Sequence, residues 1–331
     1  MSNAPRTVAV VLNWRRPEDT LACVASLAAI DRPLDIVVVD NDSQDGSYQR
    51  IRDGLPGALP PGCDMQIHEA KPAPAQAPWR QDGGRTLILT DSGHNGGYAS
   101  GNNVGAALAL QQASTAYVWI LNNDTLVPDA GSLDALVARM DEDAGLGICG
   151  STVVYVSQSG HDGQQRIQTR GGCRFEPWRG RFMPIGAGES PRQSSNRGEV
   201  EAQLAYINGA SAFVRRAVYD TVGPMREDHF LYYEEYDWAR RLAGRFRLGY
   251  APESLVYHEV GGTIGTGEEG GGSPLSIYYL TRNRLRTLGR HAPLTLIPAL
   301  ADEAKELFKA WRRGWQPQKR ARIRALLGLG L

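Results

Sequence analysis

The chain has 331 residues, which is long enough for one large domain or for one domain with an appendage. Its 36 Lys and Arg residues balance its 36 Asp and Glu residues, so the overall charge does not favour nucleic acid as a partner. The four cysteines are scattered without a CxxC pair, so we expect neither disulfides nor a cysteine zinc site. We find neither a signal peptide nor an apolar run of roughly 18 residues, so we expect a cytoplasmic protein without a membrane span.

Apolar runs rich in β-branched residues alternate with helical patterns along the first third of the chain. We expect strands at residues 8–12, 36–39, 87–89 and 117–121. One helix is predicted to open at Arg16-Pro17, and another to cover residues 103–112. Residues 54–86 are rich in Pro, Gly and Ala and are predicted to form a long surface insertion. The alternation predicts an α/β fold, a mostly parallel sheet flanked by helices.

Three polar clusters lie at or near the ends of these strands, where open α/β sheets bind ligands. They cover residues 40–47, 95–105 and 122–125. In the first, Asp40 is placed to accept hydrogen bonds from a base or a ribose. In the second, glycines allow a phosphate to approach a helix N-terminus, although the spacing does not fit GxGxxG and a simple helix-capping turn is the alternative. In the third, Asp124 suits a ligand of Mg²⁺ or Mn²⁺, while Asn-Asn-Asp is also common turn chemistry.

Further along the chain, three carboxylates lie between aromatic residues in the segment 230–238. They are Glu234, Glu235 and Asp237. Burial beside aromatic rings raises the pKa of a carboxyl group and makes it a candidate proton acceptor. The alternative is an ordinary helix start, with acidic residues favoured by the helix dipole and Trp238 turned to the core.

Taken in order, these motifs resemble family 2 glycosyltransferases of the GT-A fold, and more narrowly their bacterial rhamnosyltransferase-like branch, over about residues 7–290. The resemblance implies that Asn13 at the end of the first strand, residues of these clusters and one arginine further downstream bind a nucleotide-sugar donor. The residues so implied are Asn13, Asp40, Asp42, Asn95, Gly96, Gly101, Asn103, Asn123 and Arg282. We interpret the nearby Arg284 as a residue on a solvated face of a helix.

The resemblance also implies a metal site. Asn122-Asn123-Asp124 occupies the Asp-x-Asp position of the family with Asn122 in place of the first Asp, so metal binding is assigned mainly to Asp124. In the family, a His at the position of His258 can join the metal or the diphosphate, although a lone His is more often structural. Both Mg²⁺ and Mn²⁺ remain open, and an imidazole ligand would favour Mn²⁺.

Glu235 stands where the resemblance places the catalytic base, and it is one methylene longer than the usual Asp. Glu234 precedes it, and Asp237 is the alternative base. The segment 206–211 is similar to the acceptor-side strand of the family. The residues expected on the acceptor side are Asn208, Gly209 and Trp238.

The function implied is that of an inverting glycosyltransferase, a hexosyltransferase that builds a bacterial surface polysaccharide or another glycoconjugate. The expected donor is dTDP-rhamnose, with UDP- and GDP-sugars as alternatives, and the acceptor is a hydroxyl of a glycan or a lipid-linked glycan. One base opposite one leaving group implies inversion, whereas a glycosidase needs two catalytic carboxylates. An NAD-type oxidoreductase and a non-catalytic nucleotide-sugar-binding relative are the alternatives.

We expect a GT-A domain over residues 1–290 and basic amphipathic helices over 291–331. Within the domain, 1–125 is the expected nucleotide-binding half and 126–290 the acceptor-binding half. The polar insertion 157–200, around Trp178, is predicted to be an acceptor loop or lid, or else a plain surface excursion. The C-terminal helices suit an anionic membrane surface, which would make the protein peripheral at the inner face of the plasma membrane. Packing on their own domain, or on a second subunit in a homodimer, is the alternative.

Overall fold

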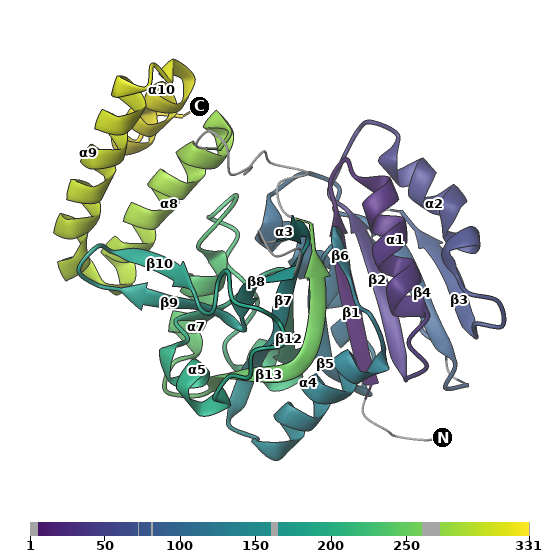
Figure 1. Ribbon diagram of the computed structural model, residues 1–331. Helices are drawn as coiled ribbons and strands as arrows, with labels where there is room; N and C mark the ends of the chain where they lie inside the picture. The colour runs from purple at the N-terminus through teal and green to yellow at the C-terminus, as the bar shows by residue number, and fades with distance from the viewer. Residues whose placement is uncertain (1–5, 72, 81, 160–164, 260–271, 331) are drawn as a thin grey trace.

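The computed structural model describes residues 6–71, 73–80, 82–159, 165–259 and 272–330 (Figure 1). The strands of its main sheet, in order across the sheet, are β3 (Met65–Ala70), β4 (Arg85–Asp91), β2 (Leu34–Asp40), β1 (Arg6–Asn13), β5 (Thr115–Asn122), β12 (Ser211–Arg215), β7 (Leu146–Ser159), β13 (Arg247–His258) and β6 (Thr125–Leu126). A tenth strand, β8 (Gln165–Arg170), pairs with β7. The first five strands of this order run parallel, and β12 is antiparallel to both of its neighbours. The sheet is therefore mostly parallel, as the sequence predicts.

Helices cover both faces of this sheet. One face packs against α1 (Pro17–Ala28), α2 (Ser47–Ala58) and α4 (Ala130–Glu142), and the other against α3 (Tyr98–Leu110), α6 (Arg216–Thr221) and α7 (Glu234–Leu242). Along β1, Val8 and Val10 contribute to the core on the α3 side, whereas Ala9 and Val11 contribute to the opposite core. Burial on both faces explains why this strand is a continuous apolar run and not an alternating one.

Helix α3 begins earlier than the predicted 103–112, because the glycine-containing segment forms its first turns. Gly105 lies against β1, where a Cβ atom would collide with the side chain of Val10. The small residues of this helix therefore let it approach the sheet closely, and its N-terminus comes to the edge where β1, β2 and β5 end.

Both predicted insertions contain regular structure. The 54–86 segment includes the edge strand β3. The described part of 157–200 contains β8, a hairpin of β9 (Gly172–Glu176) and β10 (Arg181–Pro184), and α5 (Arg197–Gln203), while residues 160–164 lie outside the described ranges. A short strand, β11 (Tyr206–Ile207), completes the small sheet of order β10-β9-β11. The prediction of a loop was wrong for the described part of 157–200, because its strands pair with partners that local composition does not reveal.

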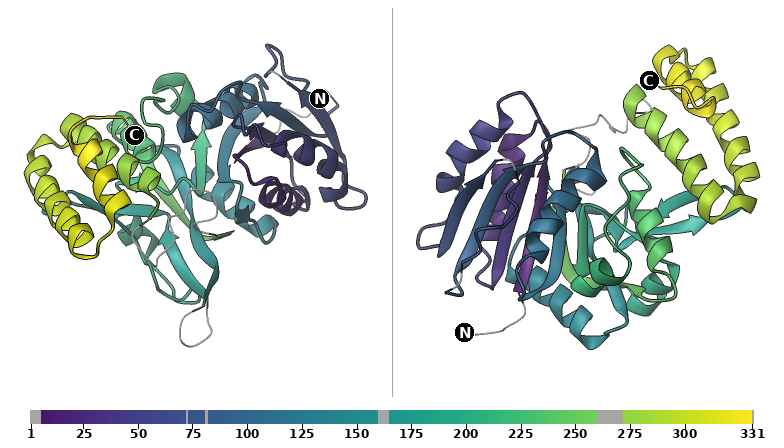
Figure 2. Two further views of the ribbon diagram at one scale, coloured as in Figure 1. Left: turned by 90° about the horizontal axis from the view of Figure 1, so that it is seen from above. Right: turned by 180° about the vertical axis from the view of Figure 1, so that it is seen from behind.

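Three helices follow the sheet: α8 (Pro274–His291), α9 (Leu296–Arg312) and α10 (Gln316–Leu326). They pack together at the end of the molecule opposite β3 (Figure 2). Arg284 of α8 is buried and forms ion pairs with Asp302 and Glu303 of α9, so the interpretation of a solvated face was wrong. None of the helices in the described ranges combines the length and apolar character that crossing a bilayer requires.

Candidate active site

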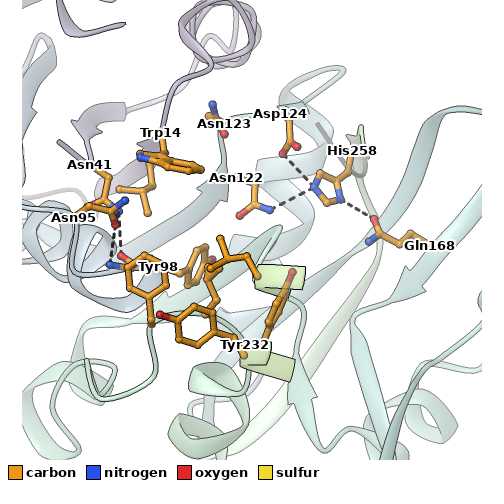
Figure 3. Close-up of a pocket in the computed structure, with 16 residues that line it drawn as sticks. Trp14, Asn41, Asn95, Tyr98, Asn122, Asn123, Asp124, Gln168, Tyr232 and His258 are labelled. Carbon is orange, nitrogen blue, oxygen red and sulfur yellow. Dashed lines mark hydrogen bonds and ion pairs between the residues drawn. The ribbon is translucent and has the colours of Figure 1, made fainter. Parts of the chain in front are cut away.

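A cavity of about 440 Å³ lies at the carboxyl ends of β1, β2 and β5 (Figure 3). Its polar residues come from the ends of strands and the start of α3, and they are Asn41, Asn95, Asn122, Asn123, Asp124, Gln168 and His258. Apart from Gly97, the other lining residues are apolar or aromatic, namely Leu12, Trp14, Tyr98, Phe230, Leu231, Tyr232, Leu275 and Tyr279. Of the residues predicted to form the site, Asn95, Asn123, Asp124 and His258 line this cavity.

Asp124 and His258 face each other on the polar wall. Asp124 follows β5 and His258 ends β13, and the carboxylate Oδ1 lies 3.1 Å from the imidazole Nε2. The backbone holds the two segments in place, because the Glu259 amide donates to the Asp124 carbonyl at 3.0 Å. Gln168 of β8 contacts the other ring nitrogen, with its Oε1 2.7 Å from His258 Nδ1.

These contacts fix the tautomer of His258. An amide oxygen only accepts hydrogen bonds, so Nδ1–H is the donor to Gln168 Oε1. In the neutral ring, Nε2 then carries a lone pair, to which Asn122 Nδ2 donates at 3.3 Å. That lone pair also faces the Asp124 carboxylate, and two acceptors 3.1 Å apart need a proton or a cation between them.

This donor pair fits a divalent metal. One carboxylate and one imidazole suit Mn²⁺, and the carboxylate also suits Mg²⁺. A second hydrogen bond from the far nitrogen of the ring, here to Gln168, is the usual arrangement for a ligand histidine. No group of three or more His, Cys, Asp or Glu in the described ranges is arranged to hold a metal. A metal held by Asp124 and His258 would therefore need substrate oxygens or water to complete its coordination.

Asn41 joins the end of β2 to the start of α3. Its Nδ2 donates to Asn95 Oδ1 at 3.0 Å and to the Gly97 carbonyl at 3.2 Å. Gly97 has φ +92°, and a Cβ there would collide with the Phe230 carbonyl. That carbonyl accepts a hydrogen bond from the Tyr98 amide at 3.0 Å. The 230–232 segment therefore covers the first turn of α3, so this amide is already satisfied by protein.

Asp40 and Asn13 lie behind the cavity wall. Asp40 is buried and accepts hydrogen bonds from Asn13 Nδ2 at 2.6 Å, from Ser43 Oγ at 2.6 Å and from the Ser43 amide at 3.0 Å. Asn13 is also buried, and its Oδ1 accepts from Thr20 Oγ1 at 2.8 Å and from Asn123 Nδ2 at 3.4 Å. This network positions Asn123, which does line the cavity, whereas neither Asp40 nor Asn13 does.

Five other residues assigned to the donor also lie outside the cavity lining, namely Asp42, Gly96, Gly101, Asn103 and Arg282. The Asp42 carboxylate accepts a hydrogen bond from Gln44 Nε2, and the Arg282 guanidinium donates one to Asn283 Oδ1. Gly101 lies within α3, where its amide donates to the Gly97 carbonyl and a Cβ would collide with Leu12. Asn103 Nδ2 donates hydrogen bonds to the Met225 carbonyl at 2.8 Å and to Glu227 Oε1 at 2.9 Å. The polar side chains among these residues thus bond other groups of the protein in this structure.

Glu234 and Glu235 open α7 just after two residues with left-handed backbone, Tyr232 (φ 68°) and Tyr233 (φ 75°). Such a conformation is costly for bulky residues and is often found at functional sites. Burial raises the pKa of Glu235 to about 7. Burial, followed by the charge of Glu235, raises the pKa of Glu234 well above its usual value, and its Oε2 has no hydrogen-bond partner among the described residues.

Glu235 is partly exposed, and it does not line the main cavity. It lines a void of about 10 Å³ next to Gly209, and Tyr98 lines both the void and the main cavity. The Tyr98 hydroxyl donates to the Gly209 carbonyl at 2.7 Å. Tyr98 therefore stands between the cavity and the carboxylate.

Asp237 lies on a different side of α7 and is fully buried. Burial alone would raise its pKa, but hydrogen bonds from His291, Arg290 and Arg241 outweigh that effect and lower the pKa to about 2. The distances from its oxygens to these groups are 2.8 Å, 3.0 Å and 3.0 Å. A carboxylate this weakly basic does not suit the role of general base, and its position indicates that it ties α7 to α8.

The acceptor-side residues divide between backbone and core. Asn208 Oδ1 accepts from the Ala210 amide at 2.8 Å and so shapes the turn before β12. Gly209 lies beside Glu235. Trp238 is 2% exposed, packs edge-on against Tyr219 and donates from Nε1 to the Gly223 carbonyl at 2.9 Å. Trp238 is therefore a core residue, and the prediction that it contacts an acceptor was wrong because its indole points inward.

Sequence reasoning missed several lining residues. Trp14 directly follows Asn13 at the end of β1, so its position at a strand end was a usable signal. Gln168 carried no signal, because it comes from the segment that was expected to be a loop. Tyr232 belongs to the aromatic segment 230–238 and Tyr279 lies three residues before Arg282, but neither was predicted to line a cavity, although both do.

No protein-family model matches the chain, and no curated protein matches it. Solved structures do. The mannosyltransferase PcManGT from Pyrobaculum calidifontis, in complex with GDP-Man and Mn²⁺, is similar over 98% of this chain and 86% of that one, with 15% identity and a TM-score of 0.53. S. aureus TarS 1-349 in complex with UDP-GlcNAc is similar over 97% and 81%, with 15% identity and a TM-score of 0.55. GalNAc-T7 with UDP, GalNAc and Mn²⁺ is similar over 78% of this chain but 44% of that one, with 13% identity and a TM-score of 0.53. At these identities the likeness shows the fold, which is the GT-A fold.

Proposed function

We propose that the chain is an inverting glycosyltransferase that transfers a sugar from a nucleoside diphosphate to a hydroxyl of a glycan or lipid-linked glycan. The observation that carries the proposal is the Asp124–His258 pair, with Nε2 and Oδ1 3.1 Å apart, on the wall of a strand-end cavity in a GT-A fold. The solved neighbours with GDP-Man or UDP and Mn²⁺ support it, because they show that this fold serves such ligands. By resemblance the donor is dTDP-rhamnose.

The charges around the cavity support a metal. A nucleoside diphosphate brings negative charge, yet no Lys or Arg is among the described residues that line the cavity. Asp124 and His258 would hold the metal, which supplies positive charge that stabilises the departing diphosphate. Gln168 keeps the Nε2 lone pair of His258 directed at that position. The imidazole ligand favours Mn²⁺ over Mg²⁺.

The remaining roles belong to side chains around and behind the cavity. Trp14 and Tyr98 offer ring surfaces against which a base or a sugar can pack, and Asn41, Asn95 and Asn123 offer amide groups on the polar wall. Glu235 is the proposed general base, since a carboxyl group with a pKa of about 7 can take a proton near neutral pH. A single base acting opposite the leaving group implies inversion at the anomeric carbon.

The proposal is tested by isothermal titration of the chain with dTDP, UDP, GDP and NAD⁺, each with Mn²⁺ and with EDTA. We expect one nucleoside diphosphate to bind in a metal-dependent manner and to lose that dependence in Asp124→Ala. Product analysis with the matching sugar nucleotide then tests transfer and the configuration of the product. Binding of NAD⁺ alone would support the oxidoreductase alternative, and metal-dependent nucleotide binding without turnover would support a non-catalytic relative.

A further inference from the structure

Helix α9 presents three different surfaces along its length. Ala299, Glu303 and Ala310 are buried against the other C-terminal helices. A second set is apolar and exposed at helical spacing, and we call it the apolar stripe. It consists of Ile297, Leu300, Ala304, Phe308 and Trp311. A third set is positively charged, and each of its members directly follows a residue of the apolar stripe in the sequence. We call it the basic stripe, and it consists of Lys305, Lys309 and Arg312.

The exposure of the apolar stripe is unusual in its extent. Ile297 is 79% exposed, Phe308 55% and Trp311 60%, and the Phe308 and Trp311 rings pack together with centroids 5.7 Å apart. Single exposed apolar residues are normal on a protein surface, but a contiguous row with two aromatic residues marks an interaction surface. At 1.5 Å per residue, the row from Ile297 to Trp311 is roughly 21 Å long.

The turn of the β9–β10 hairpin lies next to the start of α9 (Figure 1). Gly180 of the hairpin lies against the start of α9, where a Cβ would be 2.9 Å from Ala299 Cβ, and Arg181 pairs with Asp302 at 2.5 Å. Trp178, two residues before Gly180, is 92% exposed, and Leu294 just before α9 is 91% exposed. The hairpin thus packs against α9 on the side of Ala299 and Asp302, and Trp178 and Leu294 are further exposed apolar side chains near that end of the helix.

Positive charge dominates next to these apolar side chains. Residues 294–331 contain eight Lys and Arg but three acidic residues. Each of the three acidic side chains is already paired with an arginine: Asp302 and Glu306 with Arg181, and Glu303 with Arg284. Lys309 of the basic stripe also pairs with Glu306 at 2.8 Å, whereas Lys305 and Arg312 form no ion pair within the described ranges and remain available to an anionic partner.

We propose that the apolar and basic stripes of α9 form a docking surface for an anionic lipid bilayer. An amphipathic helix with Trp, Phe and Leu on one face and Lys and Arg beside it lies in the membrane interface, with its apolar side chains in the acyl boundary and its cations at the headgroups. A second copy of the chain fits less well, because it would bring the same uncompensated positive charge to the contact. This surface lies outside the donor cavity, so the inference stands apart from the sugar-transfer proposal.

The test is flotation of the full chain with vesicles of phosphatidylcholine alone and with vesicles that also contain phosphatidylglycerol. We expect the chain to float only with the anionic vesicles and to be released by high salt. The double variants Phe308→Ser/Trp311→Ser and Lys305→Glu/Arg312→Glu should each reduce the bound fraction at least about tenfold. The control Arg50→Glu/Arg52→Glu makes the same charge change on α2, at the opposite end of the molecule, and should bind as the unmodified chain does.

Two further measurements separate a loss of membrane binding from a loss of folding. Thermal unfolding shows whether each variant is folded, and tryptophan emission should shift to shorter wavelength with anionic vesicles, less so in Trp311→Phe. The proposal is overturned if the unmodified chain does not float with anionic vesicles, or if the α2 control loses binding equally. It is also overturned if light scattering shows a dimer that Phe308→Ser/Trp311→Ser converts to monomer, because a second copy would then occupy the surface.

Discussion

A Cβ atom on Gly209 would lie 2.5 Å from Oε1 of Glu235, closer than any side chain allows. The same position is 2.8 Å from the Tyr98 hydroxyl oxygen. Gly209 therefore makes room for the carboxylate on one side and for the tyrosine that donates to its own carbonyl on the other. The absence of a side chain at this point lets α7, α3 and the turn before β12 meet.

Gly209→Ala should therefore displace Glu235 and Tyr98. We expect a loss of transfer activity of at least about tenfold, since a misplacement near 1 Å in a catalytic arrangement can cost about 100-fold. Nucleotide affinity should fall much less than transfer activity, because Gly209 does not line the donor cavity and Tyr98 is the one displaced residue that does. The matched control is Gly57→Ala in α2, where nothing lies within 4 Å of the added Cβ. Equal activity in the two variants would contradict the close approach at Gly209.

Glu235→Gln should abolish the base while leaving the shape of the site intact. We expect turnover to fall roughly 10²–10⁴-fold with nucleotide binding unchanged. In the unmodified chain, activity should rise with pH through about 7, because the base must lose its proton and burial raises its pKa to about 7. If Asp237 were the base, its pKa of about 2 would leave activity flat across that range. A pH–rate profile separates the two.

Gln168→Leu should weaken metal binding although Gln168 does not hold the metal. Without the acceptor for Nδ1–H, the His258 ring is free to rotate or to change tautomer, and such outer partners are typically worth about 10–100-fold in metal affinity. Electron paramagnetic resonance of free Mn²⁺, in the presence of the nucleoside diphosphate, measures this directly. Gln66→Leu, on the exposed edge strand β3, makes the same chemical change and should leave the affinity unaltered.

Asp237→Ala should destabilise the fold strongly. Removing it leaves Arg241, Arg290 and His291 without their shared anion, and breaking a buried pair typically costs about 3–5 kcal/mol in the free energy of unfolding. Asp220→Ala removes an exposed carboxylate paired with Arg216 at 3.8 Å and should cost no more than about 1 kcal/mol. Urea unfolding of both variants checks the difference.

The contribution of Asp237 should also depend on pH. Its pKa falls from 3.8 to about 2 on folding, so the stabilisation is complete above 3.8 and is lost as the pH falls toward 2. The difference in unfolding free energy between the unmodified chain and Asp237→Ala should therefore narrow only below about pH 4. A difference that narrows at neutral pH would show that another group is responsible.

Local patterns in the sequence were sufficient for much of the fold. The β-branched runs located β1, β2, β4 and β5, because a parallel strand buried on both faces must be apolar along its whole length. The same patterns could not locate β8 or β9. The residues of β8 are mostly polar and β9 has only five residues, so composition alone predicts a loop, although their partners β7 and β10 adjoin them in the sequence.

The candidate site was less predictable, because the direction in which a side chain points decides whether it can meet a ligand. A polar cluster at a strand end can point toward the ligand or back into the protein, and Asp40 points back. On α7, Glu235 and Asp237 are two positions apart, so they project from different sides of the helix. Which side meets Arg241 and Arg290 depends on how α8 packs, and no local pattern shows that.

The antiparallel strand β12 also determines when the site can form. The backbone amide of Asn122, at the end of β5, donates a hydrogen bond to the Ala210 carbonyl. Trp119 Nε1 donates one to Ser211 Oγ, 92 residues away in the sequence. Contacts between such distant segments form late in folding, because a long loop must close first. During synthesis, a chain that has reached Asp124 still lacks Gly209, Glu235 and His258. A growing polypeptide therefore cannot bring the two proposed metal ligands, Asp124 and His258, together until β13 has been synthesised.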